Sequence, residues 1–122
     1  MKEKIAEFIK DKLLTPVIYM SREIDLTLVF GFFDNSITEE MLYAMQHELS
    51  EAVGEKISII DFRSCDAFER FDIITHAELI YKESEFVKAM FETAMVQDYS
   101  VVQGEREALL RRVNKYGTPS LS

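Results

Sequence analysis

The stretch MLYAMQHELSEAVGEKISIIDF, residues 41–62, sets the fold class of this chain. Its first half spaces apolar residues three and four apart, which is the pattern of a helix with one buried face. Gly54 marks the end of that helix, because glycine readily adopts the left-handed conformation that follows a last helical turn. The apolar run over residues 56–62 is typical of a buried strand. A helix followed at once by a strand predicts a domain in which helices pack on a sheet.

Both flanks of this stretch continue the alternation of helices and strands. Ser36 with Glu39 predicts a capping box at the start of the helix before Gly54, and Gly104 predicts a kink or break in the last helix. The predicted helices are 2–14, 37–53, 66–75 and 84–116, and the predicted strands are 17–20, 24–30, 56–62 and 78–82. This order indicates an α/β (α+β) fold with a small mixed sheet of about four strands and a long C-terminal helix. Residues 1–116 form one predicted domain, and 117–122 a flexible tail.

Composition excludes several classes of protein. The chain has 122 residues, of which 48% are hydrophobic and 30% charged, as in an ordinary single globular domain. Its net charge of −8 disfavours direct binding to nucleic acid, because phosphates repel an acidic surface. No apolar run is long enough to span a membrane. A single cysteine, Cys65, excludes an internal disulfide and fits a reducing cytoplasm.

Three segments carry a resemblance to a known family. They are REIDLTLVF (22–30), MLYAMQHELSEAVGEKISIIDF (41–62) and AFERFDIITHAELIYKES (67–84), and the long last helix follows them. In this order and spacing they resemble the minimal nucleotidyltransferases, small polymerase-β-like proteins of the MntA type. The resemblance implies that the gene is encoded beside a HEPN-domain partner and that the chain is an antitoxin. Active members of the family adenylylate a tyrosine of the toxin.

The sequence departs from the family's catalytic pattern. That pattern is a Gly-Ser turn that grips the triphosphate, a D-x-D pair that holds a divalent metal, and a later Asp on the next strand. Here only Ser21 and Arg22 separate the first strand from Glu23 and Asp25, which take the places of the D-x-D pair, and Ser58 takes the place of the third carboxylate. Glu23 and Asp25 remain relic candidates for weak metal binding. Without a phosphate-binding turn the triphosphate is not oriented, and orientation contributes about 7–11 kcal/mol to catalysis. We therefore expect no efficient catalysis.

Other candidate sites give weaker signals. Phe30-Gly31-Phe32 superficially resembles a Phe-Gly-Ser turn, but Phe32 replaces the serine and no alternating acidic pair follows. His47, His76 and Cys65 do not have the spacing of zinc ligands or of a thiol catalyst.

The last helix carries a candidate partner-binding stripe. Its apolar positions extend further than one small sheet can cover, so we predict partner contacts at Met95, Tyr99, Val102 and Arg106. The alternative is that the methionines fill the core and that the rest of the stripe is an ordinary solvated face.

Three functional hypotheses follow. The first is a catalytically degenerate nucleotidyltransferase-like antitoxin that neutralises a HEPN-domain toxin by binding, needs no cofactor and acts in the cytoplasm as a homo- or hetero-oligomer. The second is a residual Mg²⁺-dependent adenylyltransferase that uses Glu23 and Asp25 and modifies a tyrosine of a partner. The third is a homodimeric α/β module without a toxin.

Overall fold

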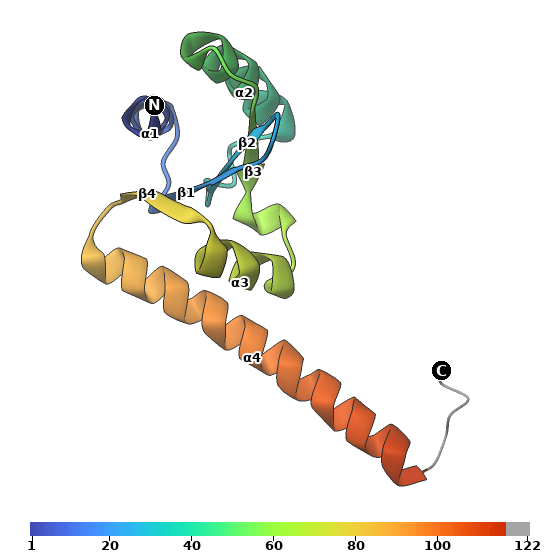
Figure 1. Cartoon of the computed structure of the whole chain (residues 1–122). Helices are drawn as coiled ribbons and strands as arrows, with labels where there is room; N and C mark the ends of the chain where they lie inside the picture. Colours follow the sequence, from blue (N-terminus) through green and yellow to red (C-terminus); the bar gives the residue numbers. More distant parts are fainter. Residues whose placement is uncertain (117–122) are drawn as a thin grey trace.

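The structure, a computed structural model, describes the backbone of residues 1–116 and the side chains of residues 1–112 (Figure 1). The predicted tail, 117–122, lies outside the described residues. The elements in chain order are α1 (Lys2–Lys12), β1 (Val17–Arg22), β2 (Thr27–Gly31), α2 (Glu39–Val53), β3 (Ile57–Asp61), the 3-10 turn η1 (Phe62–Ser64), α3 (Ala67–His76), β4 (Glu78–Lys82) and α4 (Glu85–Tyr116). The predicted order of helices and strands is confirmed.

The four strands form one mixed sheet in the order β3-β2-β1-β4. β1 runs antiparallel to both of its neighbours, and β2 runs parallel to β3. The parallel pair requires a crossover connection, and α2 provides it. The predicted fold class, a mixed four-stranded sheet with packed helices, is confirmed.

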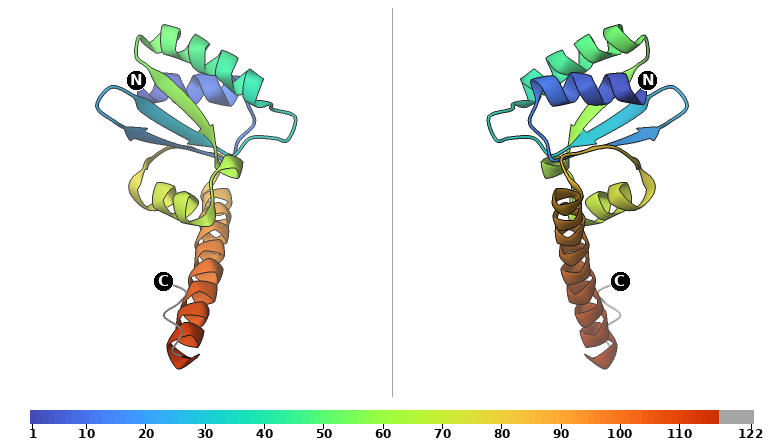
Figure 2. Two further views of the ribbon diagram at one scale, coloured as in Figure 1. Left: turned by 90° about the vertical axis from the view of Figure 1, so that its right-hand side faces the viewer. Right: turned by 90° about the vertical axis from the view of Figure 1, so that its left-hand side faces the viewer.

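Helices cover both faces of the sheet (Figures 1 and 2). α1 and α2 lie on one face and α3 and α4 on the other, because successive side chains of a strand alternate between faces and both sets are apolar here. The first face buries Ile5, Ile9, Leu13, Ile18, Met20, Val29, Phe33, Leu49, Ile57 and Ile59. The second buries Val17, Tyr19, Phe30, Phe62 and Ile73.

Phe62 is the centre of the second core. It is fully buried, and its ring centroid lies 5.8 Å from that of Tyr19 and 5.1 Å from that of Phe91, both in edge-to-face arrangements. Such pairs are favourable because the positive edge of one ring meets the negative face of the other. Phe91 belongs to α4, so this cluster fixes the first part of the long helix on the sheet.

The cap of α2 differs from the prediction. Thr38, not Ser36, is the N-cap, and its hydroxyl accepts a hydrogen bond from the Met41 amide at 3.2 Å. The Ser36 hydroxyl donates instead to the Asp34 carboxylate at 2.6 Å within the preceding turn. That bond also lowers the pKa of Asp34. The other end of α2 is as predicted, since Gly54 adopts a left-handed conformation with φ of 77°.

Side chains of α2 cover the outer edge of β3. Ile57 donates its amide to Ser50 Oγ at 3.1 Å, and Ile59 donates its amide to Gln46 Oε1 at 2.9 Å. An edge strand otherwise presents unpaired backbone groups to solvent. The helix that connects β2 to β3 therefore also closes this side of the sheet.

α4 is continuous from Glu85 to Tyr116 and runs straight (Figure 1), so the kink or break predicted at Gly104 is wrong. One glycine costs a helix only about 1 kcal/mol relative to alanine, which the rest of the helix easily overcomes. At 1.5 Å per residue α4 is about 48 Å long, and its C-terminal half extends away from the rest of the molecule (Figure 2).

Candidate functional site

Glu23 and Asp25 lie in the tight connection between β1 and β2. The predicted strand at 24–30 begins only at Thr27, because β1 continues to Arg22 and the chain then reverses direction over residues 23–26. The Glu23 amide donates to the Leu26 carbonyl at 2.8 Å and closes this turn. The two acids therefore lie in a turn and not at alternating positions of one strand. Both are exposed, and Ile24 between them is 98% exposed.

The surroundings of this turn contain positive as well as negative charge. Arg22 Nη2 lies 3.8 Å from Glu55 Oε1, and the Thr27 hydroxyl lies 3.4 Å from Glu55 Oε2. Together with Lys56 they line a shallow cavity of about 260 Å³. Arg22 thus pairs with the acid that precedes β3 rather than with Glu23 or Asp25.

Ser58, which the resemblance places at the position of the third carboxylate, lies on β3. It pairs in register with Leu28 of the neighbouring strand β2. Among the residues that the structure describes, no group of three or more acids, histidines or cysteines gathers closely enough to hold a metal ion. Mg²⁺ in transferases is usually held by one or two carboxylates together with substrate phosphates. Glu23 and Asp25 therefore fit such an ion only if a nucleotide is also bound.

Asp61, three residues after Ser58, is committed to a structural role. Its carboxylate accepts from Arg63 Nε at 2.9 Å and from Arg63 Nη2 at 2.6 Å. Arg63 also donates to Asn35 Oδ1 and, at 3.0 Å, to the Asp34 carbonyl. This bidentate pair raises the pKa of Arg63 and fastens the loop after β2 to the end of β3.

Gly31 is a packing position rather than part of a phosphate-binding turn. A Cβ atom at Gly31 would lie only 2.5 Å from Cζ of Phe33. Phe33 is buried against the first core, so Gly31 allows the ring to fold back over the end of β2.

Cys65 is not activated as a nucleophile. Burial raises the pKa of its thiol, which disfavours the thiolate that a nucleophile needs.

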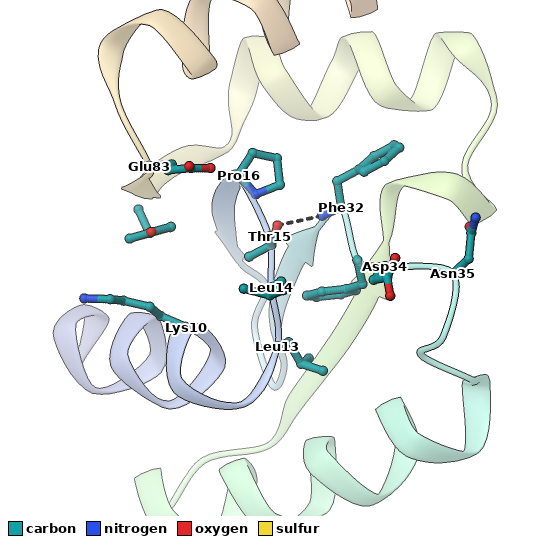
Figure 3. Close-up of a pocket in the computed structure, with 11 residues that line it drawn as sticks. Lys10, Leu13, Leu14, Thr15, Pro16, Phe32, Asp34, Asn35 and Glu83 are labelled. Carbon is teal, nitrogen blue, oxygen red and sulfur yellow. Dashed lines mark hydrogen bonds between the residues drawn. The ribbon is translucent and has the colours of Figure 1, made fainter.

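A large cavity lies at the opposite end of the sheet from residues 23–26 (Figure 3). It has a volume of about 720 Å³, and its lining includes Lys10, Leu14, Asp34 and Glu83. Thr15 accepts a hydrogen bond from the Phe32 amide at 3.0 Å at its centre (Figure 3). No sequence motif marks this cavity, because its residues come from α1, β4 and three separate connections.

The predicted partner-binding residues lie on the side of α4 that faces α3. Met95 is 5% exposed, and Val102 is half-buried. The Tyr99 ring stacks on Phe71 with centroids 4.0 Å apart, and the Arg106 guanidinium lies 5.5 Å from the Phe68 ring. These contacts hold the two helices together. Partner binding by these four residues stays a prediction, and the burial of Met95 favours the alternative that it fills the core.

Comparisons with solved structures identify the fold. The structure of the toxin–antitoxin MntA–HepT covers 92% of this chain and 95% of its own, with a TM-score of 0.76 and 16% identity. The complex of tri-AMPylated Shewanella oneidensis HEPN toxin with MNT antitoxin covers 92% and 94%, with a TM-score of 0.76 and 16% identity. A toxin–antitoxin structure with AMP-PNP covers 92% and 97%, with a TM-score of 0.74 and 15% identity.

This chain has the MntA fold. The fold implied by the resemblance is thereby confirmed, with its mixed sheet and its long C-terminal helix. No protein-family model matches the sequence, and a search of curated proteins also gives no match. Of the helices that the structure describes, none is long and apolar enough to cross a membrane.

Proposed function

We propose that this protein is the antitoxin of a toxin–antitoxin pair and that it neutralises a HEPN-domain toxin by binding, without nucleotidyl transfer. The observation that carries the proposal is the turn at residues 23–26. Two adjacent antiparallel strands joined by so short a connection leave no backbone loop between β1 and β2 to hold a triphosphate. The MntA fold and its occurrence in complexes with HEPN toxins support the choice of partner.

Charge supports neutralisation by binding. The net charge of −8 repels RNA but attracts a surface that itself binds RNA. A toxin that acts on RNA needs a basic surface, and an acidic partner that covers it would also be steered to it. In this proposal the protein acts in the cytoplasm and needs neither a metal nor a nucleotide.

The second candidate function is a residual Mg²⁺-dependent adenylyltransferase. The observation in its favour is that the Glu23 and Asp25 side chains are both exposed on one short turn and are free to reach an ion. In this alternative the partner would supply the missing phosphate contacts, and a tyrosine of the partner would receive AMP.

The two functions make opposite predictions in one experiment. The chain is co-expressed with the HEPN-domain protein encoded beside it, and growth rescue and transfer of label from α-labelled ATP are measured. Neutralisation by binding predicts full rescue by the Glu23→Ala/Asp25→Ala variant and no labelled toxin. Loss of rescue together with loss of label would establish the transferase instead. Glu107→Ala, an exposed acid on α4, is the matched control.

A further inference from the structure

The side of α4 that points away from α3 carries no charged residue from Phe86 to Ala108, and Arg112 follows on the same face. Its members recur every three or four positions and therefore share one helix face, and all of them are exposed. They are Phe86, Met90, Ala94, Gln97, Val101, Gly104 and Ala108. We call this set the outer face of α4. Phe86, Met90 and Val101 are 71%, 59% and 60% exposed. A solvated helix usually places its charges on the side opposite the core, so the outer face has the composition of a contact surface.

Gly104 has no role in the fold of the single chain. A Cβ atom added there would meet nothing within 4 Å, and its backbone is ordinary helix. Glycine in a helix interior costs about 1 kcal/mol relative to alanine. A second helix that crosses close to Gly104 would make use of the missing side chain.

We propose that the outer face of α4 pairs with the outer face of a second copy of this chain, antiparallel about a two-fold axis level with residue 99. In this register Met90 lies opposite Ala108, Ala94 opposite Gly104, and Gln97 opposite Val101. Met90 of the first half thus meets a small residue of the second half, whereas Phe86 lies opposite Arg112. The closest approach is at Ala94 and Gly104, where helix axes can come to about 8 Å.

The charges at the two ends of α4 favour the same orientation. The first turns carry one excess negative charge and the last turns one excess positive charge. The charged residues are Lys82, Glu83, Glu85, Lys88 and Glu92 at the beginning, where Lys82 pairs with Glu85, and Glu105, Arg106, Glu107, Arg111 and Arg112 near the end. An antiparallel pair brings the acidic end of one copy to the basic end of the other, and a parallel pair would place like charges together. The helix dipoles also prefer opposite directions.

The rest of the molecule leaves room for this arrangement. The sheet and α3 lie on one side of α4, and no helix or strand of residues 1–116 lies on its opposite side (Figure 1). Two copies would pair back to back along residues 86–112, about 40 Å of helix at 1.5 Å per residue, with their α/β bodies pointing apart. The same patch of surface contributes from both copies, as two-fold symmetry requires.

Light scattering after size-exclusion chromatography tests the proposal on the full chain without any partner. The wild type is expected to have twice the 14.2 kDa mass of one chain. Ala94→Arg is expected to reduce it to one chain, whereas Ala89→Arg, an exposed alanine off the outer face, should not. A wild type that stays monomeric over a concentration series, or a dimer that survives Ala94→Arg, would overturn it. If the chain alone is monomeric and Ala94→Arg abolishes toxin binding, the face belongs to the toxin and the homodimer is wrong.

Cysteine cross-linking tests the register without a large substitution. In a Cys65→Ser background, Ala94→Cys mixed with Gly104→Cys should give a disulfide-linked dimer under mild oxidation, and neither variant alone should. A parallel pair would instead link Ala94→Cys to itself, which would contradict the register. Because the partner toxin is absent, neither outcome bears on the proposed antitoxin function.

Discussion

The Tyr19 hydroxyl on β1 donates a hydrogen bond of 2.6 Å to Oε2 of Glu92 on α4. Tyr19 is almost completely buried, and Oε1 of Glu92 also lies 3.6 Å from Nζ of Lys88 one turn earlier. Burial, and then the neighbouring carboxylate, raises the pKa of Tyr19 above its ordinary value. This bond joins a central strand of the sheet to the helix that extends furthest from it.

Tyr19→Phe should destabilise the protein at neutral pH by about 2 kcal/mol, because a hydrogen bond to a charged acceptor is lost. The difference in the free energy of unfolding between wild type and Tyr19→Phe should shrink above pH 10. There the unfolded wild type loses the Tyr19 proton while the folded state keeps it, so wild-type stability falls with pH by up to about 1.4 kcal/mol per unit. Urea unfolding at pH 7 and above pH 10 measures both effects. An unchanged difference would show that the raised pKa of Tyr19 does not contribute.

Arg63→Ala should destabilise the protein, because the largely buried Asp61 carboxylate loses its charged partner and, among the described residues, keeps only the backbone amide of residue 63 as a donor. Arg63→Lys should rescue little of this loss, since a lysine cannot reproduce the two-pronged contact. Hydrogen exchange should show faster exchange over residues 32–38, the loop that Arg63 holds. Full rescue by lysine would mean that charge alone matters.

Tyr99→Ala should destabilise the contact between α3 and α4 by about 2 kcal/mol, because it removes a stacked ring from Phe71. Val101→Ala, two residues away on the outer face, should change the stability of the monomer by less than about 0.5 kcal/mol. Thermal unfolding of both variants in the Ala94→Arg background compares them without self-association. Equal effects would contradict the assignment of the two faces.

Gly31→Ala should lower the free energy of unfolding, whereas Gly104→Ala should raise it. The methyl group at position 31 would overlap the Phe33 ring, and overpacking of this kind costs about 1–3 kcal/mol. At position 104 the methyl group meets open space, so the better helix former should stabilise the monomer by about 1 kcal/mol. Denaturant unfolding in the Ala94→Arg background measures both. A destabilising Gly104→Ala there would show an intramolecular role for this glycine.

The sequence predicted the elements better than their ends. The spacing of apolar residues located every helix and strand, and Gly54 and the run at 78–82 were placed correctly. The turn at residues 23–26 was missed, because Ile24 and Leu26 have the composition of a strand and the pairing of β1 with β2 decides where the chain reverses. Ser36 was predicted as the cap because Glu39 follows it at capping-box spacing, but its hydroxyl bonds to Asp34 instead, which depends on the conformation of the turn.

Candidate site residues were harder to predict than the fold. Helical spacing placed Met95, Tyr99, Val102 and Arg106 on one stripe, and they do share a face. The spacing could not tell that α3 covers this face, because which side of a long helix is covered depends on tertiary packing. The opposite, uncharged side carried an equally regular pattern that became visible only once the covered side was known.

The hydrogen bonds from the backbone of β3 to Ser50 and Gln46 have a consequence for solubility. Open strand edges can recruit strands of other molecules and grow into fibrils. Since α2 occupies the amides of Ile57 and Ile59, unlimited growth of a cross-β stack from that side is blocked for as long as the helix stays in place. Partial unfolding of α2 would therefore expose the β3 edge to the addition of strands from other molecules.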